Sequence, residues 1–142
     1  EKDNLEKLDI IKYHGQQEDV HSFIKKSHAT ILPSYHEGLA NVLLESASSG
    51  RPVLASRVPG CIETYEDGLT GFGFEAMNVD SLVEAIIKFI KLPYDEKSEM
   101  GIAGRRKIEN EFDRNTVINT YLQEINLITN RGNINESIRE VS

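Results

Sequence analysis

The sequence has one cysteine, no tryptophan and no long hydrophobic run among its 142 residues. The single thiol, Cys61, excludes an internal disulfide and a zinc site built on several thiolates, and it favours a reducing compartment. No apolar stretch approaches the roughly 20 residues that a membrane span requires. We therefore expect a cytoplasmic protein with no membrane-spanning segment in this chain.

Positive charge is also scarce, since 16 Lys and Arg residues stand against 23 Asp and Glu residues and give a net charge of −7. This is the wrong sign for a protein that binds the phosphate backbone of nucleic acids or anionic lipid. Nucleic acid is therefore not an expected partner. Apolar residues at 39% and charged residues at 27% are typical of a soluble domain, and the length fits one domain.

Short apolar runs alternate with segments of helical periodicity along most of the chain. We expect strands at residues 9–13, 29–32, 52–56 and 71–74, helices at 20–26, 38–49, 78–90, 95–110 and 116–130, and a helical turn at 59–65. Because the strands are apolar almost throughout, the pattern predicts an α/β fold with a parallel sheet covered by helices on both faces. The segment after the last helix is polar, and we expect it to be frayed.

The segment most informative about function follows the predicted strand at 29–32. A proline ends that strand, Glu37 lies in the loop, Gly38 allows close approach of the backbone, and a helix is expected to begin. Ligands of parallel sheets bind beyond the carboxyl ends of the strands. The free amides and the dipole of a helix N-terminus favour an anion, so the segment predicts a phosphate site.

Two carboxylates flank this predicted site. Glu37 and Glu45 are eight positions apart, about 12 Å along a helix, which is too far for paired acid–base work on one bond. A carboxylate accepts two hydrogen bonds from a vicinal diol but is repelled by phosphate. The pattern therefore indicates a nucleoside diphosphate sugar, with one glutamate on the sugar and the other on the ribose. The alternative is that Glu37 only favours the helix dipole and Glu45 is a solvated helical residue.

Residues 33–56 and 58–74 resemble the donor-binding part of retaining glycosyltransferases of family 4, which have the two-domain GT-B architecture. The family pattern has two glutamates separated by seven residues, then Gly-x-Pro-Val before a strand, a Gly-x-x-Glu loop and a Gly-x-x-Gly turn. The sequence contains these features in that order, at Glu37 with Glu45 and at residues 50–53, 60–63 and 68–71. The resemblance extends over residues 8–128.

This resemblance implies a Rossmann-like domain that is the C-terminal half of a GT-B architecture, with its first strand–helix units missing. We expect residues 1–130 to form the truncated nucleotide-sugar-binding domain and residues 131–142 to be a polar tail. The implied reaction transfers a hexosyl group from a UDP- or GDP-linked donor to an acceptor hydroxyl, with retention at the anomeric centre. Polysaccharide or glycoconjugate synthesis is the expected setting.

The resemblance also implies a set of site residues. Glu37 would contact the donor sugar and is the candidate catalytic residue, with an electrostatic role. No metal ion and no cofactor are expected. The expected donor-binding residues are Gly38, Leu39, Ala40 and Asn41 through their backbone amides, Glu45 through the ribose diol, and His14 and Gly15 against the nucleobase.

The sequence departs from the family pattern at its start. No Gly-Arg-containing loop with a downstream lysine precedes Asp9, and the N-terminal acceptor domain is missing. In the family, the Arg and Lys neutralise the leaving diphosphate, so a large electrostatic contribution to catalysis is lost without them. We therefore expect this chain alone to be inactive. Peripheral contact with the inner face of a membrane would come from the missing domain.

Two other functions stay open. One is a non-catalytic α/β protein-interaction module, although a module has no need for a carboxylate, a glycine, a helix N-terminus and a second carboxylate in that order. The other is a sugar-nucleotide epimerase of the same GT-B architecture, which would bind the same donor.

Three residues keep open or structural roles. Glu63 either caps the short helix or approaches the donor, Arg57 either assists a phosphate or is a surface residue, and Cys61 is expected to be a buried thiol.

Overall fold

The computed structural model describes residues 11–139, apart from the side chains of Val117 and of residues 130–139. Three parallel strands form one sheet in the order β1–β2–β3, where β1 is Thr30–Leu32, β2 is Val53–Ser56 and β3 is Gly71–Phe74. The register aligns the first residues of the three strands with one another. The loops that follow these strands therefore leave the sheet at one common edge.

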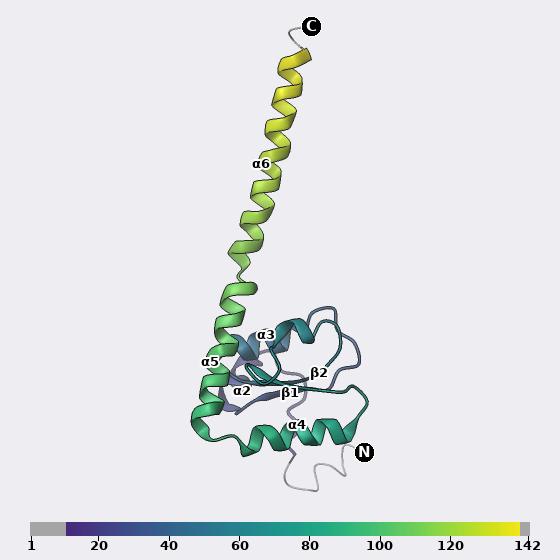
Figure 1. The fold of residues 1–142 in the computed structure, drawn as a ribbon, viewed down its shortest axis with the longest axis vertical. Coiled ribbons are helices and arrows are strands. Elements are labelled where there is room, and N and C mark those ends of the chain that lie inside the picture. Colours follow the sequence, from purple (N-terminus) through teal and green to yellow (C-terminus); the bar gives the residue numbers. More distant parts are fainter. Residues whose placement is uncertain (1–10, 140–142) are drawn as a thin grey trace.

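Helices cover both faces of this sheet (Figure 1). They are α2 at His21–Lys26, α3 at Asn41–Ser48, α4 at Val79–Lys91, α5 at Tyr94–Glu111 and α6 at Arg114–Arg139, with a 3-10 turn, η1, at Ile62–Thr64. The predicted α/β fold with a parallel sheet is confirmed.

The central strand β2 holds the core together because both of its faces are covered. Val53 and Ala55 lie in a cluster with Leu43 of α3, whereas Leu54 lies in a second cluster with Phe89 of α4. Successive side chains of a strand point to opposite faces, so alternate residues of β2 face α3 and α4. Leu43 and Leu54 are no more than 1% exposed. Burial of Leu43 fixes α3 on one face of the sheet, and burial of Leu54 fixes α4 on the other.

Glycine allows α5 to pack closely on the turn that ends α3. Gly50 has a φ of +69° and follows the last turn of α3, where the amide of Arg51 donates to the carbonyl of Ser46 at 2.9 Å. A Cβ atom at Gly101 of α5 would collide with the carbonyl of Gly50. The C-terminal end of α3 is thus held in place. Its N-terminal end comes after the loop that leaves the sheet at the carboxyl end of β1.

The strand predicted at residues 9–13 is wrong for residues 11–13, which form no strand, while residues 9 and 10 lie outside the described part of the chain. Residues 11–20 are exposed throughout. A strand needs the backbone of a neighbour for its hydrogen bonds. Within the described sheet, β1 is an edge strand that pairs with β2 alone, and residues 11–13 do not pair with its other edge.

Helix α6 projects away from the α/β body (Figure 1). It continues to Arg139, so the segment after Asn130 is helical up to that residue rather than frayed. No proline and a single glycine, Gly132, follow its first residue, so nothing local stops it. Over residues 11–139, none of the helices combines the length and apolar character needed to cross a bilayer.

Candidate functional site

The loop that follows β1, residues 33–40, leaves the sheet at its carboxyl edge and leads into α3. Within it, Ser34 Oγ donates a hydrogen bond to Glu37 Oε1 at 2.5 Å, in a partly buried position. This bond fixes the carboxylate that the sequence singled out. Ser34 was not among the predicted site residues, and its spacing of three from Glu37 is the signal that could have identified it.

Helix α3 begins later than predicted, at Asn41 with Ala40 as its N-cap rather than at Gly38. The amide of Ala40 donates to the carbonyl of Gly60 at 2.9 Å, and the amide of Asn41 donates to the carbonyl of Leu39 at 2.9 Å. These bonds keep the loop non-helical up to Ala40. The separation of about 12 Å expected between the two glutamates assumed a continuous helix, so it does not apply.

The late start of α3 decides which amides a ligand can use. Of the four residues predicted to bind through their amides, Ala40 and Asn41 already donate within the chain. The amides of Gly38 and Leu39 have no acceptor among the described residues. The loop therefore presents two free donors next to the carboxylate of Glu37.

The loop that follows β2, residues 57–63, packs against the first loop. Gly60 has a φ of +83°, and a Cβ atom there would collide with the backbone carbonyl of Glu37. The amide of Gly60 donates to Glu63 Oε2 at 2.8 Å, while its carbonyl accepts the amide of Ala40. Only glycine combines this backbone conformation with this close approach. The carboxylate of Glu63 thus holds the amide of Gly60, and no side-chain bond caps η1 itself.

Cys61 lies in the second loop and is completely buried. Burial raises the pKa of its thiol, and the negative charges of Glu37 and Glu63 raise it further. A thiol with a raised pKa is a poor nucleophile at neutral pH. The predicted buried thiol is confirmed. The carboxylate of Glu37 in the first loop and that of Glu63 in the second loop both raise its pKa.

The remaining predicted donor-binding residues lie on other elements. Glu45 is exposed on α3, four residues after the first residue of the helix. His14 packs the edge of its ring against Phe23 of α2, with 4.6 Å between ring centroids, and Gly15 follows with a φ of +67°. Helix α2 in turn contacts α3. The structure thus links the His14 loop to α3 through α2, and it brings Glu37 close to Gly60.

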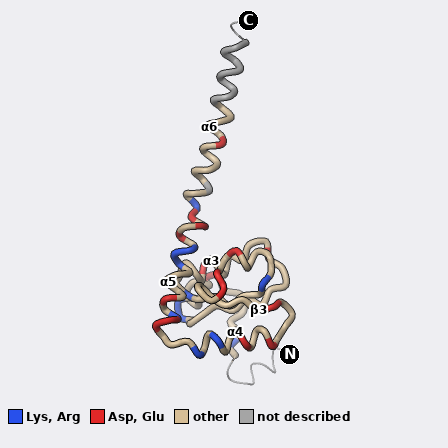
Figure 2. The backbone as a smooth tube through the Cα atoms, viewed as in Figure 1, with Lys and Arg blue, Asp and Glu red and all other residues tan. Residues whose placement is uncertain are grey.

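Arg57, the first residue after β2, is used within the protein. Its guanidinium contacts Asp67 at 2.7 Å and Glu75 at 3.3 Å, so it ties β2 to the ends of β3. Residues 27–50 contain no Lys or Arg, and the basic residues nearest to α3 in Figure 2 lie on other segments, among them α5. The first loop therefore offers free amides and a carboxylate, without a cation of its own.

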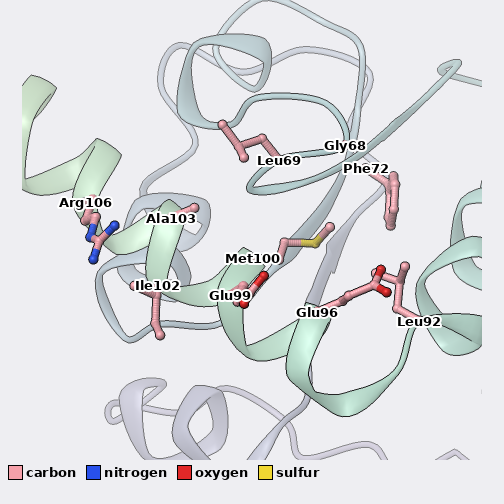
Figure 3. A pocket seen from close by; sticks show the side chains of 10 residues that line it. All are labelled: Gly68, Leu69, Phe72, Leu92, Glu96, Glu99, Met100, Ile102, Ala103 and Arg106. Atoms are coloured by element: carbon pink, nitrogen blue, oxygen red, sulfur yellow. The ribbon is translucent and has the colours of Figure 1, made fainter.

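A pocket of about 560 Å³ lies elsewhere, between α5 and β3 (Figure 3). Met100 of α5 points into it, and Leu69 and Phe72 close it from the side of β3. It lies toward the amino end of β3, whereas ligands of parallel α/β sheets bind beyond the carboxyl ends. None of the predicted site residues lines this pocket, so it is not the candidate site.

The sequence model of the family described as glycosyl transferases group 1 matches residues 1–107. The chain belongs to the group 1 glycosyltransferases.

Two bacterial glycosyltransferases illustrate what this chain is similar to. The capsular polysaccharide biosynthesis glycosyltransferase CapM of Staphylococcus aureus is 31% identical over 72% of this chain and 29% of CapM. The lipopolysaccharide core biosynthesis glycosyltransferase LpsE of Rhizobium meliloti (strain 1021) is 28% identical over 87% of this chain and 38% of LpsE. This chain therefore spans well under half the length of these two relatives.

Solved glycosyltransferases share the fold of this group 1 domain. Anabaena Alr3699/HepE in complex with UDP superposes with a TM-score of 0.78 over 87% of this chain and 34% of HepE, at 19% identity. A glycosyltransferase from Rickettsia africae ESF-5 superposes with a TM-score of 0.75 over 85% of this chain and 32% of its own, at 25% identity. The predicted fold class, an α/β domain of the kind found in GT-B glycosyltransferases, is confirmed.

Proposed function

We propose that this chain is the donor-binding domain of a retaining glycosyltransferase of family 4, which transfers a hexosyl group from a UDP- or GDP-linked donor to an acceptor hydroxyl. The observation that carries the proposal is the first loop, where Glu37 is fixed by Ser34 and is followed by the two free amides of Gly38 and Leu39. Further support comes from the relatives. HepE has been solved with UDP and with UDP-glucose, and CapM is named for capsular polysaccharide biosynthesis.

Each part of the donor has a proposed partner in the site. The amides of Gly38 and Leu39 donate to the diphosphate oxygens, which the dipole of α3 also favours. The carboxylate of Glu37 lies beside the sugar ring and stabilises the positive charge that develops there as the glycosidic bond breaks. The carboxylate of Glu45 accepts hydrogen bonds from the ribose diol. Ala40 and Asn41, whose amides are used internally, shape the loop.

The nucleobase is assigned to the loop of His14 and Gly15. His14 is exposed and contacts Phe23 of α2, which in turn contacts α3, and its imidazole can form hydrogen bonds. Selectivity for the nucleobase would then depend on residues well separated in sequence from the first loop, which binds the diphosphate.

This proposal gives the chain no group that stabilises the departing diphosphate. Arg57 is paired with two carboxylates, and residues 27–50 have no Lys or Arg. The missing first strand–helix units of the domain would supply these cations and the N-terminal domain would supply the acceptor site, so the chain alone would bind the donor without turnover. Polysaccharide or glycoconjugate synthesis is the proposed setting. Neither the interaction module nor the epimerase is favoured by a structural observation or by the relatives.

Donor binding is tested by a two-dimensional amide NMR titration of this chain with UDP, GDP, ADP and UDP-glucose. We expect UDP or GDP to shift the amides of Gly38 and Leu39 and of Glu45, and the base to shift His14. Glu45→Gln should weaken binding about tenfold, because it removes one charged hydrogen-bond acceptor. Glu84→Gln, at an exposed glutamate on α4, is the matched control and should leave binding unchanged. A folded chain that shows no shift with any nucleotide would refute donor binding.

The reaction itself is tested on a longer protein that includes the acceptor domain. The anomeric proton of the product, measured by NMR, distinguishes retention from inversion. Product formed from the nucleotide sugar without any acceptor would instead identify an epimerase.

A further inference from the structure

The first loop restrains the carboxylate of Glu37 with a hydroxyl of its own. Ser34 Oγ donates a hydrogen bond to Glu37 Oε1 at 2.5 Å, and both residues are half-buried. Tyr35 and His36, which lie between them in the sequence, are exposed. The bond therefore joins the two half-buried polar side chains of a loop that is otherwise open to solvent at this point.

The backbone of Glu37 is fixed independently of this bond. Gly60 of the second loop lies so close that a Cβ atom there would collide with the carbonyl and with the Cβ atom of Glu37. Gly60 is itself held by the carboxylate of Glu63 and by the amide of Ala40. What stays free at Glu37 is rotation of its side chain, and the bond from Ser34 restricts that rotation.

Restraint of this side chain before a ligand arrives lowers the cost of binding. A free glutamate loses rotamer freedom when it takes hold of a ligand, and that loss is subtracted from the affinity. A carboxylate that is already held at one oxygen has lost much of this freedom on folding. Ser34 can therefore strengthen binding at Glu37 without touching the ligand.

The same bond decides which group the ligand must bring. Ser34 occupies Oε1, and within the described part of the chain no other hydrogen bond or ion pair involves this carboxylate. Oε2 is left to accept a hydrogen bond from a hydroxyl, whereas a phosphate would be repelled. The amides of Gly38 and Leu39 follow directly and favour an anion. A hydroxyl-bearing ring linked to a phosphate matches both features.

We propose that Ser34 is a positioning residue for the donor sugar. Its hydroxyl holds Glu37 Oε1, so that Oε2 meets a hydroxyl of the sugar ring. The proposal rests on the proposed function, which assigns Glu37 to the sugar. Loss of the Ser34 hydroxyl should then weaken the binding of a nucleotide sugar and spare the bare nucleotide, which binds through Gly38, Leu39 and Glu45.

Amide NMR titrations of this chain test the proposal, with UDP, UDP-glucose, UDP-galactose, UDP-N-acetylglucosamine, GDP and GDP-mannose as separate probes. For each protein, the dissociation constant of a nucleotide sugar is divided by that of its bare nucleotide. Ser34→Ala should raise this ratio about fivefold for the sugar that the wild-type chain binds most tightly, the effect of losing one hydrogen bond. The dissociation constant of the bare nucleotide should stay the same.

Two further variants separate positioning from folding. Ser34→Thr keeps the hydroxyl and should restore the ratio. Ser27→Ala is the matched control, because Ser27 is also half-buried and donates to a residue three positions away, the carbonyl of Ile24 at 2.8 Å. It should leave the ratio unchanged. If Ser34→Ala weakens the bare nucleotide as much as the nucleotide sugar, the hydroxyl only folds the loop and the proposal is wrong.

A double-mutant cycle tests whether Ser34 acts through Glu37. Glu37→Ala removes the carboxylate, so the addition of Ser34→Ala should change the ratio no further. Additive effects of the two substitutions would mean that Ser34 contacts the sugar itself, and they would overturn its assignment as a positioning residue.

Failure of this inference is distinguishable from failure of donor binding. If UDP or GDP shifts the amides of Gly38 and Leu39 but Ser34→Ala leaves every ratio unchanged, the role of Ser34 is refuted and donor binding stands. If no nucleotide and no nucleotide sugar shifts any amide of the folded chain, the proposed function fails and the role of Ser34 fails with it.

Discussion

The loops that follow β1 and β2 leave the sheet at the same edge, but they use their polar groups in different ways. In the first loop, the amides of Gly38 and Leu39 have no acceptor among the described residues. In the second loop, Gly60 uses both its amide and its carbonyl within the protein, and Cys61 is completely buried. Under the proposed function, the first loop contacts the ligand and the second loop supports it. A substitution in the second loop should therefore act on folding first, whereas one in the first loop should act on binding.

The largest expected effect comes from Gly60→Ala. The new Cβ atom would collide with the carbonyl of Glu37, and the φ of +83° is unfavourable for alanine. We expect the free energy of unfolding to fall by about 3 kcal/mol, measured by urea denaturation. Gly38→Ala is the matched control, because a Cβ atom there meets nothing within 4 Å. It should change stability by less than about 0.5 kcal/mol and weaken UDP binding instead. Equal losses of stability in both variants would contradict the division of roles.

A smaller effect is expected at Glu63. Glu63→Ala removes the acceptor of the bond from the amide of Gly60, so the free energy of unfolding should fall by about 1 kcal/mol. Glu63→Gln keeps an acceptor oxygen and should restore most of that loss. Chemical denaturation of the three proteins checks this order. If Glu63→Ala is as stable as the wild type yet loses UDP binding, Glu63 contacts the donor rather than the loop.

The third effect is confined to alkaline pH and concerns Tyr65, which follows the second loop. Burial raises the pKa of its phenol to about 12, against about 10 for an unperturbed tyrosine. As pH rises, the phenol therefore loses its proton in the unfolded chain before it does so in the folded chain. The contribution of Tyr65 to the free energy of unfolding is complete below pH 10 and is lost as pH rises through about 12. Ultraviolet absorption of phenolate should show one late-titrating tyrosine that Tyr65→Phe removes. A phenol that titrates near pH 10 in the folded chain would contradict its burial.

The smallest effect is expected at the ion pair that begins the second loop. Burial opposes ionisation of Asp67, but hydrogen bonds from the amide of Gly73 and from Arg57 outweigh it and lower the pKa of the carboxyl. Its contribution is therefore present above the unfolded pKa of about 3.8 and is lost as pH falls through the folded pKa. Because the side chains are 40% and 50% exposed, Asp67→Asn should cost only a few tenths of a kcal/mol at neutral pH.

The pH dependence provides the check on this last prediction. The stability difference between the wild type and Asp67→Asn should shrink in acid. Glu75→Gln, at the longer 3.3 Å contact with Arg57, should have a smaller effect at every pH. A difference that grows as pH falls would mean that the carboxyl is not stabilised in its charged form.

Most of the α/β body could be predicted from local sequence patterns. The apolar runs at β1, β2 and β3 and the helical periodicity of α4 each depend on residues close in sequence, and each was predicted within a few residues. The strand expected at residues 9–13 failed because a strand depends on a partner that local pattern does not reveal. Helix α6 passed its predicted end because polar residues alone do not stop a helix.

The candidate site was predicted in its residues more than in its geometry. Spacing and resemblance identified Glu37 and Gly60, but the close approach between them joins segments that follow different strands. That contact delays the start of α3 and uses the amide of Ala40, so two of the predicted amide donors proved to be engaged.

Because Cys61 is completely buried, the reactivity of its thiol is a probe of local opening around the second loop. A thiol reagent can reach this sulfur only when the residues packed around it open, and no other cysteine of the chain contributes to the signal. The labelling rate of the native chain therefore reports opening of the second loop, which packs against the first loop. A nucleotide that binds the closed arrangement should slow labelling in proportion to its occupancy, so a single colorimetric trace would report ligand binding and loop opening together.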